Sequence, residues 1–365
     1  MTDPYAAAGV DTAAGDRAVE LMKRSVSATH TTAVLGGVGG FAGLFDASAI
    51  AGMRSPVLAT STDGVGTKVE IARALDKHDT IGQDLVGMVV DDIVVVGARP
   101  LFLTDYIACG RVVPERIAEL VAGIADACRR TGTALLGGET AEHPGLLAPD
   151  AYDLAGAAVG AVERDALLGP DRVRDGDVVL ALASSGLHAN GFSLVRRILA
   201  DAGLAPTDAV ADLGGPIGET LLTPTRLYTA ELLDLLASPD GSAVRALSHV
   251  TGGGIAANLA RVLPAGTAVQ LERPSWSPAP VFRVLADLGG LALADVEGTW
   301  NLGIGMLAVV APEAADAVTA RLAGLGVPTW TAGVVSTEAA AGNGWTHGAK
   351  GVDGGAVRLT GCYAA

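Results

Sequence analysis

The chain has 365 residues, of which 50% are hydrophobic and 18% charged, and it carries 25 Lys+Arg against 40 Asp+Glu. This composition excludes a disordered or fibrous protein, and the net charge of −15 argues against broad binding to nucleic acids or anionic membranes, which require a basic footprint. The three cysteines lack CxxC spacing, the N-terminus lacks an apolar signal-peptide core, and no uncharged run reaches the roughly 18 residues of a membrane helix. We therefore expect a soluble, cytoplasmic protein, and the length suggests two domains.

Apolar periodicity in the first half predicts a mixed order of helices and strands, interrupted by Gly-rich loops. One short buried strand, at 134–136, is expected to end at Gly137-Gly138-Glu139. A polar stretch at 167–177 that contains Gly169, Pro170 and Gly176 indicates a domain boundary. The predicted helices are 14–27, 67–75, 83–96 and 114–130, and the predicted strands are 56–60, 101–107, 134–136 and 152–162.

The second half continues the mixed order, which predicts an α/β or mixed α+β fold in two domains. We place the domains at 1–170 and 171–337, followed by a Gly-rich tail at 338–365 with a possible last strand near 356–360. The predicted strands are 178–183, 268–272 and 302–310, and the predicted helices are 192–204, 224–236, 255–261, 278–288 and 313–325.

Generic nucleotide-binding patterns carry little weight here. The P-loop pattern GxxxxGK[ST] is absent, which excludes a P-loop NTPase. Loose GxGxxA matches begin at Gly37 and Gly303, but neither follows the strand, glycine turn and helix that a dinucleotide-binding fold requires.

The segment Ser61–Lys68, STDGVGTK, is more specific. A predicted strand leads into a turn with one carboxylate and two glycines, and Lys68 follows in the first turn of a helix. Main-chain N–H groups at such a turn favour an anion, and Asp63 could bind Mg²⁺ beside it. A tight Asp-Gly turn without a ligand is the alternative.

Seven ordered motifs together resemble one family. The motifs resemble aminoimidazole ribonucleotide synthetase, the phosphoribosylformylglycinamidine cyclo-ligase family of purine biosynthesis, in register from about Tyr5 to Val335. They are GGVGGF (36–41), TDGVGTK (62–68), HDTIGQDLV (78–86), GGETAEHPG (137–145), SSGLHANGFSLVR (184–196), LLTPTR (221–226) and TGGGI (251–255).

The resemblance implies a fold and an assembly. In this family the N-terminal domains of a homodimer contribute strands to a shared intersubunit barrel, each C-terminal domain is an α/β layer, and ATP and the ribonucleotide lie in a cleft between the halves. Two alternatives stay open. One is another ATP-dependent enzyme of the same superfamily, such as a thiamine-monophosphate kinase-like phosphoryl transferase, and the other is a catalytically silent nucleotide-binding homologue.

The resemblance also implies the reaction. ATP phosphorylates the formyl amide oxygen of formylglycinamidine ribonucleotide, an internal amine attacks that carbon, and the ring closes to 5-aminoimidazole ribonucleotide with release of ADP and phosphate. The enzyme would be a ligase, and its contribution to catalysis would be to position the reactants and to neutralise the charge that develops during phosphoryl transfer.

Matching positions in the N-terminal half suggest where the nucleotide binds. Mg²⁺ is assigned to Asp63, Asp92 and Glu139, and Lys23 and Lys68 are candidate phosphate cations, although Lys23 could equally be a solvated helix residue. We expect the glycine loop 36–43 to be a mobile lid that orders on nucleotide binding. The other candidate nucleotide-binding residues are Gly36, Gly37, Gly39, Gly40, Gly64, Gly66 and Thr67.

Matching positions in the C-terminal half suggest where the substrate binds. Ser185, His188 and Asn190 lie in a loop that suits substrate recognition or proton transfer, although a lone histidine is more often structural. Thr251, Gly252, Gly253 and Gly254 precede a helix and could bind the ribose 5-phosphate, or they could form a plain Gly-rich connection. We assign catalytic roles to His188, Asp63 and Lys23.

Overall fold

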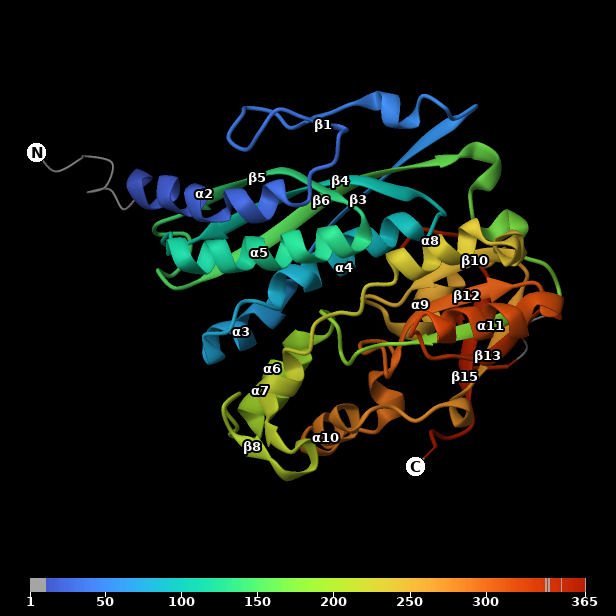
Figure 1. Cartoon of the computed structure of the whole chain (residues 1–365). Coiled ribbons are helices and arrows are strands. Elements are labelled where there is room, and N and C mark those ends of the chain that lie inside the picture. Colours follow the sequence, from blue (N-terminus) through green and yellow to red (C-terminus); the bar gives the residue numbers. More distant parts are fainter. Residues whose placement is uncertain (1–10, 339, 341, 349, 365) are drawn as a thin grey trace, which may run out of the picture. The chain divides into compact units, whose positions relative to one another are not determined.

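The structure is a computed structural model that describes residues 11–338, 340, 342–348 and 350–364 (Figure 1). The extreme N-terminus considered for a signal peptide, and positions 339, 341, 349 and 365 of the predicted tail, lie outside the described residues. The chain divides into two compact units, described separately below. Unit 1 comprises the chain up to Ile93 and Ala98–Asp165, and unit 2 comprises Val94–Gly97 and the chain from Ala166.

Unit 1 is built on a four-stranded sheet in the order β3-β6-β4-β5. Neighbouring strands are antiparallel except β4 and β5, which are parallel and therefore need a crossover connection, supplied by helix α5. Small residues on β6 allow close helix packing, because a Cβ at Gly156 would lie 3.5 Å from Leu85 of α4. The strands are β3 Pro56–Gly64, β4 Arg99–Cys109, β5 Ala134–Glu142 and β6 Tyr152–Glu163.

Two helices of unit 1 have identifiable end signals. α5 begins with a proline in its first turn and ends at Gly132, which has the left-handed φ of +68° typical of a C-cap. The carboxylate of Asp11 caps α2 by accepting the main-chain N–H of Ala14 at 3.0 Å. No helix in the described ranges is long and apolar enough to cross a bilayer. The helices are α2 Thr12–Ser27, α3 Val69–Leu75, α4 Ile81–Val94 and α5 Pro114–Thr131.

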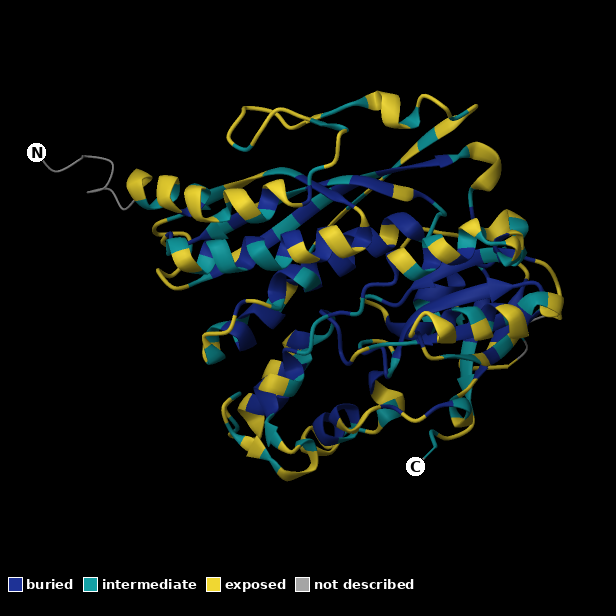
Figure 2. Ribbon diagram, viewed as in Figure 1, coloured by how far each residue is buried: buried dark blue, intermediate teal, exposed yellow. Residues whose placement is uncertain are grey.

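A small hairpin carries the glycine-rich loop of unit 1. Strands β1 (Val34–Leu35) and β2 (Leu44–Phe45) pair antiparallel, and residues 36–43 connect them. Most of this hairpin is exposed (Figure 2).

Unit 2 is built on a seven-stranded mixed sheet in the order β10-β12-β7-β13-β11-β15-β14. Every residue of β12 is buried, and the apolar side chains of β7, β10 and β12 pack with those of α8 and α11 into one core. This continuous burial explains why β12 is apolar throughout instead of alternating. The strands are β7 Val178–Ala183, β10 Val244–His249, β11 Ala268–Glu272, β12 Ile304–Val310, β13 Thr329–Ser336, β14 Thr346–His347 and β15 Ala356–Thr360.

The remaining elements of unit 2 are helices and a short hairpin. The helices are α6 Phe192–Asp201, α7 Ile217–Leu221, α8 Thr229–Ala237, α9 Gly254–Ala260, α10 Pro280–Leu288 and α11 Ala315–Gly324, and the hairpin pairs β8 Ala209–Val210 with β9 Gly215–Pro216.

The predicted mixed α/β fold class is confirmed, with three local corrections. The strand expected at 134–136 continues to Glu142, because parallel pairing with β4 holds Gly137 and Gly138 in the sheet. Strands β10 and β13 were not predicted, and neither were the short strands β1, β2, β8, β9 and β14 or the short helix α7. The helix predicted at 224–236 begins only at Thr229, because the preceding residues 223–228 form an irregular segment that buries Thr225.

Candidate nucleotide and substrate sites

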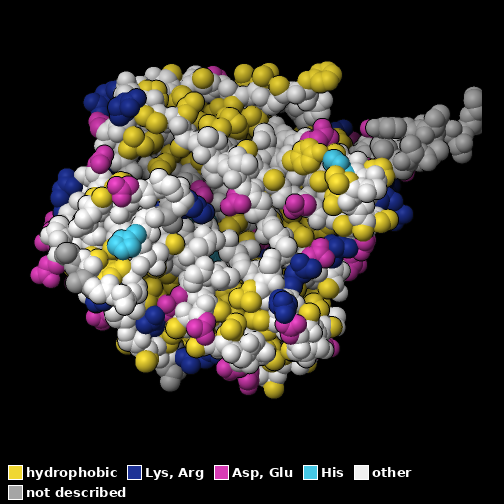
Figure 3. All heavy atoms as spheres, turned by 180° about the vertical axis from the view of Figure 1, so that it is seen from behind, with side chains coloured by type: hydrophobic (Ala, Val, Ile, Leu, Met, Phe, Trp, Pro, Cys, Tyr) yellow, Lys and Arg dark blue, Asp and Glu magenta, His cyan; other side chains and the backbone are white. Residues whose placement is uncertain are grey.

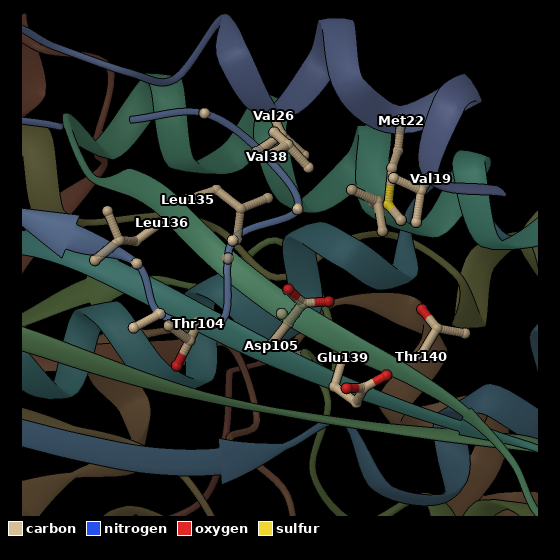
Figure 4. A pocket seen from close by; sticks show the side chains of 18 of the residues that line it. Val19, Met22, Val26, Val38, Thr104, Asp105, Leu135, Leu136, Glu139 and Thr140 are labelled. Carbon is tan, nitrogen blue, oxygen red and sulfur yellow. The ribbon is translucent and has the colours of Figure 1, made fainter. Parts of the chain in front are cut away.

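A cavity of about 620 Å³ lies in unit 1, at the β5 edge of the sheet. Its size falls in the range of small-molecule sites. Figure 4 shows apolar side chains of α2 and β5 around it, with two carboxylates, Asp105 and Glu139. Residues that pair across neighbouring strands share a face of the sheet. Glu139 pairs with Tyr106 and Asp105 pairs with Gly138, so the two carboxylates lie on different faces.

The glycine-rich loop forms one wall of this cavity. Gly37, Gly39 and Gly40 line it, and Gly36 begins the loop. Gly36 and Gly39 have φ values of +88° and +103°, which other residues rarely adopt. Gly43, at the end of the loop, packs closely against β5, since a Cβ there would come within 2.5 Å of Leu136 Cγ. The loop's mobility stays a prediction.

The STDGVGTK segment lies at the end of β3. Asp63 is exposed, and its Oδ1 accepts the main-chain N–H of Gly64 at 2.7 Å. Gly66, at φ +71°, opens a short 3₁₀ turn that contains Thr67 and Lys68. Lys68 is completely buried, and its Nζ donates to Asp84 Oδ1 at 2.9 Å. Burial lowers the pKa of the Lys68 ammonium, and the Asp84 charge opposes that shift.

Lys23 and Asp92 occupy outer positions on their helices. Lys23 is half-exposed on α2 and pairs with Glu20 at 2.6 Å, whereas Met22 and Val26 of the same helix line the cavity. Asp92 is exposed on α4, next to the buried Asp91. Among the residues that the structure describes, no three His, Cys, Asp or Glu side chains are grouped to hold a metal ion. Carboxylate oxygens do suit Mg²⁺, so a magnesium ion here would need further ligands from phosphate or water.

His188 is held in an unusual backbone conformation in unit 2. It is buried with a φ of +63°, and its Nε2 accepts the main-chain N–H of Ser185 at 3.2 Å. That bond places the proton of the neutral ring on Nδ1. A left-handed φ at a residue with a side chain costs free energy and is found disproportionately at functional sites.

The surroundings of His188 leave no spare space. A Cβ at Gly305 of β12 would lie 2.5 Å from His188 Cε1 and would overlap the Tyr228 hydroxyl, which donates to the Ala183 carbonyl at 2.8 Å. Gly305 is therefore the residue that lets His188 and Tyr228 occupy their positions.

Asn190 and the TGGG segment lie close together. A Cβ at Gly252 would be 3.4 Å from Asn190 Oδ1. Asn258 Nδ2 donates to the main-chain oxygens of Thr251 and Gly254 at 3.2 and 2.8 Å, which fixes the segment before α9. The structure thus gathers Asn190 with the TGGG segment, and separately gathers Ser185 with His188. The phosphate role of the segment stays a prediction.

Two groups were missed at the sequence level. Asp105 interrupts the alternating apolar row Leu103, Ile107, Cys109 of β4, so the alternation itself could have exposed it. Tyr228, which precedes α8, gives no such signal, because its partners Gly305 and Ala183 lie on strands β12 and β7, which only the fold brings next to it.

The comparisons with known proteins agree with one another. The family model "AIR synthase related protein, N-terminal domain" matches residues 46–162, and the corresponding C-terminal domain matches 174–342. The chain is 48% identical to the phosphoribosylformylglycinamidine cyclo-ligase of Shouchella clausii and 50% identical to that of Sorangium cellulosum, in both cases over 92% of this chain and 96% of the relative. The fold resembles that of thiamine-monophosphate kinase from Stenotrophomonas maltophilia, with a TM-score of 0.66 at 20% identity over 94% of this chain and 97% of that one.

Proposed function

The chain belongs to the AIR synthase related family, and from this premise we propose that it is a ligase that closes the ring of formylglycinamidine ribonucleotide with ATP, giving 5-aminoimidazole ribonucleotide. The observation that carries the proposal is the near-half identity with two cyclo-ligases over nine-tenths of the chain. The weaker likeness to a thiamine-monophosphate kinase concerns the fold alone. Asp63, Asp92, Glu139 and His188 are all present, which disfavours a silent homologue.

We assign substrate recognition to the His188 loop. The reaction needs a poor leaving group, the amide oxygen, to be activated by phosphorylation, after which an internal amine attacks. Ser185 holds the orientation of the His188 ring through Nε2. For His188 to donate a hydrogen bond from Nδ1 to the substrate, the closely packed loop around it would first have to open, because the side chain is buried. The closely packed Gly305 and Tyr228 support this role, because they restrict the ring to one position.

We assign nucleotide binding to the cavity of unit 1. The glycine loop can approach a ligand with its main-chain N–H groups, since Gly37, Gly39 and Gly40 carry no side chains. Asp63, Asp92 and Glu139 would hold Mg²⁺ together with phosphate oxygens, and the ion would neutralise charge during phosphoryl transfer. Lys23 and Lys68 remain proposed phosphate cations. Lys68 would first have to leave its buried pair with Asp84.

A second copy of the chain is the proposed partner of unit 1. β3 is an edge strand, and Leu58 and Tyr106, on the face of the sheet opposite the helices, are 62% and 43% exposed. Hydrophobic side chains also gather at the upper left of the space-filling view (Figure 3). Soluble proteins rarely leave such edges uncovered. Light scattering should give about twice 36.5 kDa, and a fully active monomer at micromolar concentration would contradict the shared barrel. We place the homodimer in the cytoplasm.

A turnover assay tests the activity. Purified protein is incubated with ATP, Mg²⁺ and formylglycinamidine ribonucleotide, and both ADP and the diazotisable aminoimidazole are measured. We expect one ADP per aminoimidazole formed and no ADP with thiamine monophosphate. ADP formation with thiamine monophosphate but not with the ribonucleotide would favour the kinase instead.

A further inference from the structure

Asp105 is an acidic residue in an otherwise apolar row of β4. Its neighbours on the same face, Leu103 and Ile107, are completely buried under the helices. Asp105 itself lines the cavity, and Figure 4 shows its carboxyl group pointing toward the aliphatic side chains of α2. An acid at such a position weakens the core unless it has a ligand or a partner.

The position of the Asp105 carboxyl group is built into the adjacent strand. Asp105 pairs with Gly138 of β5, where a Cβ would overlap Oδ1 and come within 2.7 Å of Cγ. Any side chain at position 138 would therefore displace the carboxyl group. This overlap explains the second glycine of the GGET motif, which the sequence alone left without a role.

The carboxyl group has unused hydrogen-bonding capacity. Among the described residues, no other side chain forms a hydrogen bond or ion pair with Asp105, and the one donor to its carboxyl group is its own main-chain N–H. Burial raises the pKa of Asp105 from its ordinary 3.8 to about 7, and the carboxyl can therefore hold a proton near neutral pH. A protonated carboxyl presents one donor beside one acceptor.

Adenine presents the complementary pair on its Watson–Crick edge. Its ring nitrogen N1 accepts a hydrogen bond and the adjacent amino group donates one, whereas guanine has a donor at N1. Aliphatic walls from Val19, Met22 and Val26 suit the flat faces of a base.

We propose that Asp105 hydrogen-bonds the base of the nucleoside triphosphate in this cavity and selects adenine over guanine. The inference rests on the proposed function for the presence of a nucleotide here. Asp105 is thus a specificity-determining residue, distinct from the groups assigned to phosphate, metal and ribonucleotide.

Binding of non-hydrolysable ATP and GTP analogues, measured by calorimetry at pH 7 on the full chain, tests this. Asp105→Leu removes donor and acceptor, and we expect it to weaken the ATP analogue by about tenfold or more with little change for the GTP analogue. Asp105→Asn keeps one donor and one acceptor and should stay within about threefold of the wild type. Asp126→Leu, the same substitution at an exposed carboxylate of α5 that does not line the cavity, is the matched control and should bind normally.

Unchanged ATP-analogue binding by Asp105→Leu, or an equal loss for both analogues, would overturn the proposal. Should Asp105→Leu not fold, Gly138→Ala provides the same test by displacing the carboxyl group. Binding is measured in the absence of the ribonucleotide, so it does not depend on turnover. If ATP binding depended on Asp105 but the protein formed no aminoimidazole, the proposed function would be wrong and the role of Asp105 would still hold.

Discussion

Replacing Gly305 with alanine should separate the position of His188 from the stability of the sheet. The new methyl group would lie 2.5 Å from His188 Cε1 and would overlap the Tyr228 hydroxyl, whereas carbon atoms normally approach to about 3.5 Å. One side chain must therefore move by about 1 Å. Overpacking of this kind costs about 1–3 kcal/mol, and loss of the Tyr228–Ala183 hydrogen bond adds about 1 kcal/mol. A 1 Å displacement of a catalytic group lowers turnover by about 100-fold.

Gly333→Ala is the matched control for this substitution. Gly333 lies on β13 of the same sheet, and its Cβ would approach the Gln270 carbonyl to 2.5 Å without touching the His188 loop. We expect both variants to lose similar free energy of unfolding in urea, but only Gly305→Ala to lose turnover in the ADP-release assay. Equal turnover of the two folded variants would refute the placement of His188 in the active site.

Three further predictions concern unit 1. Asp84→Asn should destabilise the protein by about 3–5 kcal/mol in urea unfolding, because it leaves the buried Lys68 ammonium without its countercharge, and combining it with Lys68→Met should restore most of that loss. Wild type should lose stability relative to Asp105→Asn as the pH rises from about 4 to 7, by up to roughly 4 kcal/mol. The pKa of the Asp105 carboxyl group is higher in the folded than in the unfolded protein, so the unfolded chain releases this proton at lower pH. If the free energies of unfolding of the two proteins changed in parallel with pH, the argument that burial raises this pKa would be wrong. Asp63→Asn should lower turnover by about 100-fold or more while the circular dichroism spectrum is unchanged, and normal turnover would remove Asp63 from the metal site.

How far the sequence could predict the fold depended on local pattern. α5 carries a proline start, a glycine end and a continuous apolar face, and its predicted bounds differ from the observed ones by one residue. β13 was missed because a bulge between Thr331 and Gly333 breaks its alternation, so neither period is visible in the sequence. β5 was predicted too short, since glycines disfavour strands in isolation and only the pairing with β4 keeps them extended.

Candidate sites were predictable where they depend on one continuous segment. The glycine loop and the His188 loop are such segments, and each was found from its own motif. Asp105 and Gly138 come from separate strands, Gly305 comes from β12 and Tyr228 precedes α8, and the relationship within each pair is steric. The sequence alone does not show which residues from separate segments come close together in space. It therefore could not reveal that a glycine is needed to leave room for a side chain far away in the sequence.

Unit 2 is discontinuous along the chain, and this affects how the protein can be made and divided. Val94 is completely buried in the core of unit 2, yet the rest of that unit begins only at Ala166. During translation, the ribosome therefore releases this core residue about 70 residues before its neighbours, and the core of unit 2 cannot close until the later segment has been synthesised. A recombinant fragment that starts at Ala166 would lack Val94 and would have a cavity in its core. Cutting the chain between Asp165 and Ala166 would therefore not yield an intact unit 2.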